Sequence, residues 1–227
     1  MNYSDFEQIM SATRMNRYLT ACGNNSRKAM TLYRKNLYLS QELFTVISCF
    51  EVAMRKGINC HYTNMQGNDW LRDSILQGGI FDIPACRRAK EVIGKSLVKL
   101  SVNYTHTKLL TEMDFGFWRY LFAQPQFRAG GQTLLQIFPS KPISSRTMQY
   151  NHTFVFNLLE QINTLRNRIA HHEPVCFSPS QPVINTTYAR QQYNFILQLF
   201  QWMNIDEKSL LYGLDHITTV CNEIDLL

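Results

Sequence analysis

Apolar residues recur every three or four positions along most of this chain, whereas strand-like alternation is scarce. The clearest stripe begins after Ser40 and predicts a long helix with one buried face. Its members are Leu43, Phe44, Ile47, Phe50, Met54 and Ile58. Glu51 and Arg55 lie one turn apart on this helix, a spacing that favours an ion pair. The pattern as a whole predicts an all-α fold, a multi-helix bundle of roughly eight to ten helices.

Turn and capping residues set the expected helix ends. After the turn "GNNS", Ser26 is the expected N-cap of a second helix, and Asp69 is placed to cap a short helix that begins at Trp70. Pro84 suits the first turn of a helix that runs through "ACRRAKEVIGKSLVKL". The segment 124–142 is expected to be a loop with one short helix at about 132–138. The remaining helices are expected at residues 4–20, 109–122, 144–171, 187–204 and 206–223.

The segment "LLTEMDFGFWRYLF" is strongly amphipathic and rich in aromatic residues. Such residues at helical spacing are most simply core residues. The side chains assigned to the core here are Phe115, Phe117, Trp118 and Tyr120.

Composition places the chain among globular proteins. Its 227 residues are 45% hydrophobic and 18% charged, which suits a single domain over 1–227. The Pro139–Pro142 segment is a candidate internal boundary. The longest apolar run, "LFTVISCF", has only eight residues, and a membrane span needs about twenty. With no secretory signal at the N-terminus, we expect a cytoplasmic protein that does not engage a membrane. The six cysteines form no CxxC pair, so reduced thiols are expected.

Charge points to polyanionic partners. Lys and Arg number 23 against 17 Asp and Glu, for a formal charge of +6. The helix predicted after Pro84 is strongly basic, with Arg87, Arg88, Lys90, Lys95 and Lys99. A solvated helix face is the first interpretation of such a run, and a phosphate-contacting surface is the second.

The stretch "LRNRIAHHEPVCF", residues 165–177, concentrates titratable chemistry at one point. Pro174 disfavours helical geometry at Glu173, so the helix is expected to end near His171 or His172. Cations are favourable at a helix C-terminus, and this alone accounts for a basic helix end.

The same residues also suit RNA cleavage. Arg166 holds a phosphate with paired donors, and His171 is the side chain type best suited to move a proton near neutral pH. On an ideal helix the two lie about 140° apart, so they share one groove most readily where a second subunit completes it. Asn167 adds a polar group that can orient either one. This chemistry needs the 2′-hydroxyl of RNA, and neither a metal nor another cofactor.

Two other uses of this stretch are weaker. A zinc site from His171, His172, Glu173 and Cys176 lacks the usual i, i+4 histidine spacing. A catalytic triad built on Cys176 has no identifiable base.

Three stretches of the sequence resemble segments of one protein family, and they occur along the chain in the same order as in that family. "LRNRIAHHEP" resembles the C-terminal signature of the Abi-like proteins, bacterial abortive-infection proteins of the HEPN superfamily. "CFEVAMRKGINCHYTNMQGNDWL" is similar to the family's early helix, except for Lys56, where asparagine is more usual. "LLTEMDFGFWRYLF" is similar to its central acidic and aromatic segment. The resemblance covers residues 35–210.

The resemblance implies a helical bundle that dimerises, so that two R-x4-H motifs meet and cut RNA without a metal. By carry-over, His171 would be the general acid or base, Arg166 would stabilise the phosphorane, and Asn167 would position one of them. His172 and Glu173 match the family's "HHEP" tail as supporting residues. The implied role is that of a toxin-like effector against phage, with an antitoxin protein or a noncoding RNA as a further expected partner. The alternative is a non-catalytic HEPN module that binds or senses RNA.

Overall fold

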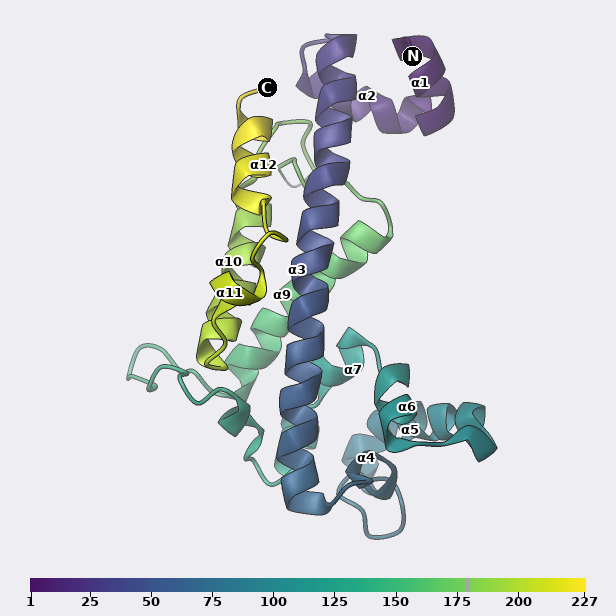
Figure 1. Ribbon diagram of the computed structural model, residues 1–227, viewed down its shortest axis with the longest axis vertical. Coiled ribbons are helices and arrows are strands. Elements are labelled where there is room, and N and C mark those ends of the chain that lie inside the picture. The colour runs from purple at the N-terminus through teal and green to yellow at the C-terminus, as the bar shows by residue number, and fades with distance from the viewer. Residues whose placement is uncertain (179) are drawn as a thin grey trace. The chain divides into compact units, whose positions relative to one another are not determined.

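The computed structural model describes residues 1–178 and 180–227, and these residues form an all-α protein, as predicted (Figure 1). Twelve α-helices and three short 3-10 helices are found in this part of the chain. The described residues hold one strand-like feature, an isolated antiparallel bridge between Phe177 and Ile184. The α-helices outnumber those expected because three predicted helices are each broken into two and residues 124–129 form a helix instead of a loop, although the second and third predicted helices join into one.

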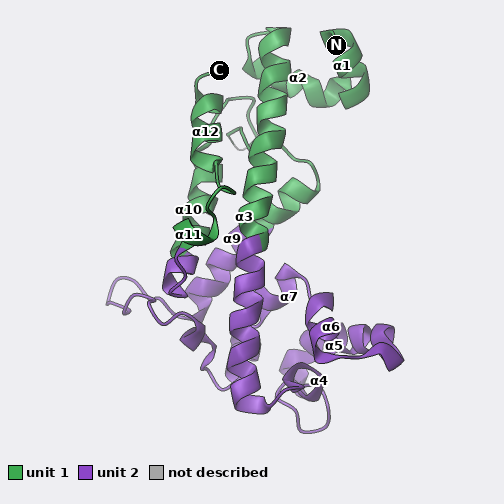
Figure 2. Cartoon of the chain, in the orientation of Figure 1, with its two compact units in different colours: residues 1–48, 164–198, 207–227 green, residues 49–163, 199–206 purple. Residues whose placement is uncertain are grey.

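The chain folds into two compact units that interleave along the sequence (Figure 2). Unit 1 comprises Met1–Ser48, Thr164–Gln198 and Glu207–Leu227, and unit 2 comprises Cys49–Asn163 and Leu199–Asp206. The candidate boundary at Pro139–Pro142 therefore lies inside unit 2.

Unit 1 opens with two helices where one was expected over residues 4–20. The break is at Ser11, whose φ of 74° turns the chain and whose hydroxyl accepts the N–H of Arg14 at 3.4 Å. The helices that contribute to unit 1 are α1 (Tyr3–Met10), α2 (Ala12–Ala21), α3 (Ser26–Gln66), α9 (His152–Ala170), α10 (Thr187–Trp202), α11 (Glu207–Leu210) and α12 (Ile217–Asp225).

Helix α3 is longer than expected, because the second and third predicted helices form one helix of 41 residues. The expected N-cap at Ser26 is wrong by one residue: the side chain of Asn25 accepts the N–H of Lys28 at 3.0 Å. The predicted apolar stripe is buried except at Phe44, which remains 43% exposed.

Helix α12 packs antiparallel to the first half of α3. The Lys28 ammonium donates to the carbonyl of Leu227 at 3.0 Å, and farther along α3 the buried Glu42 carboxylate accepts the N–H of His216 at 2.9 Å. The apolar face of α12 is fully buried in this packing; it consists of Ile217, Val220, Cys221 and Ile224.

Besides parts of α3, α9 and α10, unit 2 contains the short helices between α3 and α9. They are α4 (Trp70–Asp73), η1 (Pro84–Cys86), α5 (Arg87–Leu100), η2 (Ser101–Asn103), α6 (His106–Glu112), α7 (Phe115–Tyr120), α8 (Gln124–Ala129) and η3 (Leu134–Ile137). The start of α5 behind Pro84 and the short helix near Leu134 are confirmed. Helix α8 corrects the expected loop, since Pro125 lies in its first turn, where proline is well accommodated. Asp69 stands before α4, but its carboxylate accepts the Tyr104 hydroxyl instead of capping the helix.

The aromatic segment 109–122 forms two helices instead of one. Asp114 begins the second by accepting the Phe117 N–H at 2.7 Å. Phe115, Phe117 and Trp118 are buried as predicted, whereas Tyr120 is only half-buried.

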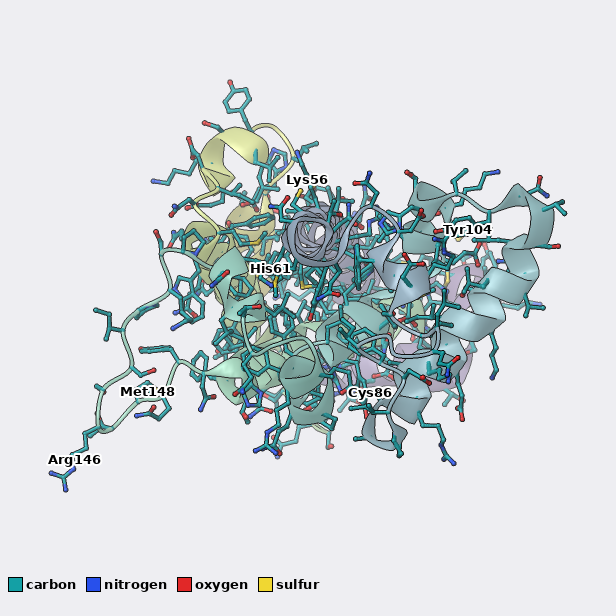
Figure 3. The ribbon with its side chains drawn as sticks, turned by 90° about the horizontal axis from the view of Figure 1, so that it is seen from below. Lys56, His61, Cys86, Tyr104, Arg146 and Met148 are labelled. Carbon is teal, nitrogen blue, oxygen red and sulfur yellow. The ribbon has the colours of Figure 1, made fainter. Side chains whose placement is uncertain are left out.

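The last two predicted helix starts also need correction. Helix α9 begins at His152 and not near Ser144, and the preceding loop carries Arg146 and Met148 away from the helices of unit 2 (Figure 3). The helix expected over 206–223 is interrupted between α11 and α12.

One helix among the described residues, α3, is long and apolar enough to cross a membrane by length and composition alone. The expectation of no membrane span considered uninterrupted apolar runs, whereas α3 qualifies through its mean hydropathy over a longer window. The core helix of a soluble protein passes the same test. Two buried polar side chains of α3 are hydrogen-bonded within the protein: Asn36 accepts the N–H of Val175 at 2.9 Å, and Glu42 accepts that of His216.

Candidate functional site

Helix α9 ends within the R-x4-H stretch, close to the predicted point. Its last helical residue is Ala170, and His172 adopts a left-handed φ of 56°. The N–H of His172 donates to Ile169 and that of Glu173 donates to Arg168, the bond pair of a Schellman cap. The cap leaves the side chains of His171, His172 and Glu173 exposed to solvent.

Arg168 holds this cap together. Its Nε contacts the Glu173 carboxylate at 3.3 Å, and its Nη2 donates to the carbonyl of Pro174 at 2.7 Å. The guanidinium also lies 4.9 Å from the centroid of the Tyr188 ring. The sequence analysis did not single out Arg168, because two of its three partners, the carbonyl of Pro174 and the ring of Tyr188, are recognisable only in the fold.

Arg166 is used differently, although it lies only two residues away. It is half-buried at the edge of the apolar stripe, as expected, and its Nη1 donates to the amide oxygen of Asn167 at 3.4 Å. Through this hydrogen bond Asn167 can orient the Arg166 guanidinium, as expected of it.

His171 and His172 line a surface depression of about 360 Å³, which helix α2 completes. Arg14 and Arg17 lie on its α2 side. Both arginines share one face of α2 at i, i+3 spacing. The sequence analysis missed them, since Arg14 lies 158 residues before His172 and only the fold brings the two segments together.

The arginines of α2 also hold the chain that follows the motif. Arg14 Nη1 donates to the carbonyl of His172 at 2.7 Å. Arg17 Nη2 donates to the carbonyls of Ser178 and Gln181 at 3.2 and 3.0 Å, and its guanidinium lies over the ring of Phe177. The cationic wall of the depression is thereby fixed in position relative to His171.

Arg166 does not line this depression. One protomer thus places His171 beside the α2 arginines, while Arg166 faces elsewhere around the α9 helix. This agrees with the helical offset expected from the five-residue step.

The cysteine in this stretch is not available for chemistry. Cys176 is fully buried, and this burial raises the pKa of its thiol to about 12. In the part of the chain that the structure describes, no group of three or more histidine, cysteine or acidic side chains is placed to hold a metal ion. The zinc arrangement therefore does not form, because Cys176 points into the core while His171, His172 and Glu173 face solvent.

The basic face of α5 is mostly neutralised by carboxylates. Arg87 pairs with Glu91, Lys90 with Asp82, and Lys99 with Glu112. Such exposed pairs are typical of a solvated face.

Comparison with known proteins finds no family model, no curated protein and no solved structure that matches this chain. The class that the described residues define is an all-α, multi-helix protein. The likeness to the Abi-like proteins therefore depends on the three sequence stretches alone.

Proposed function

We propose that the chain is a metal-independent endoribonuclease of a bacterial phage-defence or toxin system, acting in the cytoplasm as a homodimer. His171 is its general acid or base, Arg166 stabilises the charged transition state, and Asn167 positions Arg166. The observation that carries the proposal is the exposed His171 in a depression walled by Arg14 and Arg17. The resemblance in three stretches and the formal charge of +6 support it further.

The chemistry uses groups already at the site. His171 removes the proton from a ribose 2′-hydroxyl, and the 2′-oxygen attacks the neighbouring phosphorus. The bond from phosphorus to the 5′-oxygen breaks, and a protonated imidazole returns a proton to that leaving oxygen. Guanidinium groups stabilise the charge that builds on the phosphoryl oxygens. The products are a 2′,3′-cyclic phosphate and a 5′-hydroxyl.

A second protomer supplies what one protomer lacks. Within one chain, Arg166 and His171 do not line the same depression. In a symmetric dimer, Arg166 of one protomer would approach His171 of its partner, which unites the two halves of the site.

The test is RNA cleavage by the purified full chain in EDTA. End-labelled RNA should yield fragments with 2′,3′-cyclic phosphates, while DNA and 2′-O-methyl RNA stay intact. His171→Ala should reduce the rate about 100-fold or more, the usual contribution of a general acid or base. Added imidazole should restore part of the lost activity.

Arg146→Gln is the matched control for Arg166→Gln. Each variant removes one positive charge, but Arg146 lies on an exposed loop of unit 2 (Figure 3). Arg166→Gln should lose cleavage and Arg146→Gln should keep it. Cleavage that persists in His171→Ala, at an unchanged helical circular dichroism signal, rules the assignment out.

The second candidate is a module that binds RNA without cutting it. The separation of Arg166 from the His171 depression within one chain favours it, because RNA binding does not require the two to meet. Binding that weakens steeply with salt, together with intact RNA, would select this function.

A further inference from the structure

A separate cavity of about 300 Å³ lies in unit 2, between α5, α6, α7 and α9. Its volume is at the lower end of the range for small-molecule sites. The apolar part of its lining includes Phe117, and the polar part includes the amide of Asn163. Neither the R-x4-H stretch nor helix α2 contributes to it.

Charges of both signs line this cavity in equal number. Arg88 and Arg119 supply two guanidinium groups, and Glu112 and Asp114 supply two carboxylates. A lining without net charge gives a polyanion no overall attraction. A small molecule that carries both charges satisfies both kinds of group.

The two arginines are placed differently. Arg88 is exposed and its guanidinium lies 5.4 Å from the centroid of the Tyr120 ring, with no hydrogen-bond acceptor among the described residues. Arg119 is only 16% exposed, pairs with Glu160 at 3.2 Å, and has a buried Nε that also lacks an acceptor in the described part of the chain. Arg88 is therefore the donor best able to bind an incoming carboxylate.

The carboxylates also retain free acceptors. Asp114 uses Oδ1 to cap α7, which leaves Oδ2, and Glu112 uses Oε2 to pair with Lys99, which leaves Oε1. A Cβ at residue 116 would lie 3.3 Å from Asp114 Oδ1. Because Gly116 has no side chain, the carboxylate stays uncovered on that side.

We infer that this cavity binds a free α-amino acid, or a metabolite with the same adjacent ammonium and carboxylate groups. Arg88 binds the carboxylate, Asp114 and Glu112 receive the ammonium, and Phe117 lies along the remaining apolar part of the ligand. This inference is independent of the proposed ribonuclease activity.

The experiment measures the melting temperature of the full chain with each of the twenty free L-amino acids, followed by calorimetric titration of those that raise it. At least one amino acid should raise the melting temperature by several degrees at saturation. Its N-acetyl derivative and its carboxamide, which each lack one charge, should bind at least tenfold more weakly.

Two variants and a control locate the site. Arg88→Gln should weaken amino-acid binding at least tenfold. Asp114→Asn should do the same while the helix stays capped, since asparagine caps as well as aspartate. Arg87→Gln alters the neighbouring cation outside the cavity and should leave binding unchanged. The inference is overturned if no amino acid binds, if the N-acetyl derivative binds as tightly as the parent, or if both cavity variants bind normally.

Discussion

At the scale of single residues, His172 has a left-handed backbone conformation, which is unfavourable for a residue with a side chain. Its φ of 56° brings Cβ close to the backbone, and only glycine avoids this contact. We expect His172→Gly to raise the free energy of unfolding by about 0.5–1 kcal/mol, measured by urea denaturation. His171→Gly is the matched comparison and should lower it, because His171 is not left-handed. A destabilised His172→Gly protein would contradict this account of the cap.

Two half-buried histidines of unit 2, His61 and His106, make stability depend on pH. Burial lowers the pKa of His106 and of His61 below the ordinary value of 6.5. His106 contacts Asn59 through Nε2 at 2.8 Å, and its buried Nδ1 has no partner among the described residues, so a second ring proton would be unsatisfied. Asp69 and Asp73 oppose this lowering of the His106 pKa without cancelling it.

The unfolded chain therefore binds protons more readily than the folded chain at mildly acidic pH. Stability should be complete above about pH 6.5 and fall as the pH drops towards the lower folded-state pKa values. Urea midpoints measured from pH 8 to pH 5 test this. His106→Gln, which keeps a donor for Asn59, should flatten the profile in part; an equally steep profile would exclude a contribution from His106.

At the scale of helices, the sequence predicted the helices more reliably than their ends. The buried stripe from Leu43 to Ile58 identified α3, and Pro174 identified the end of α9, because periodicity and proline act locally. The break at Ser11 was missed, since serine at a helix break and serine within a helix look alike until φ is known. The N-caps at Asn25 and Asp114 could have been predicted from the sequence, because each is a favoured capping residue directly before an amphipathic segment.

The two arginines at the end of α9, Arg166 and Arg168, differ in their structural contacts. Arg168→Ala should lower the free energy of unfolding by about 2–3 kcal/mol, since it removes a charged hydrogen bond to Pro174, the Glu173 pair and the stack on Tyr188. Arg166→Ala should lower it by less than about 1 kcal/mol, since its 3.4 Å hydrogen bond to Asn167 is long and exposed to solvent. Thermal and urea denaturation of both variants separates these outcomes. Equal losses of stability would show that Arg166 is also part of the cap.

At the scale of the whole molecule, the fold adds what the motif alone could not contain. The sequence placed Arg166, Asn167 and His171 at a helix end, and this is where they lie. The arginines of α2 join His171 only through tertiary packing between distant segments, for which one sequence carries no local signal. The cavity beside Arg88 could not be predicted either. In the sequence Arg88 looks like Arg87 and Lys90, and only the structure shows that those two are paired with carboxylates.

The six cysteines, which are all free, report on the packing of both units at once. Cys60 is exposed, Cys22 and Cys49 are half-buried, and Cys86, Cys176 and Cys221 are buried. Burial raises the pKa of the thiols of Cys86, Cys176 and Cys221, so little reactive thiolate forms at neutral pH.

Maleimide labelling of the native chain at pH 7.5 should therefore modify Cys60 first, Cys22 and Cys49 more slowly, and the three buried thiols only after urea is added. Peptide mass mapping over a time course measures this order. Rapid native labelling of Cys176 would contradict the docking of α2 against residues 171–178, since the contacts around Tyr18 and Phe177 cover this part of the core. Rapid labelling of Cys86 alone would instead contradict the packing of unit 2 and would not bear on the His171 depression.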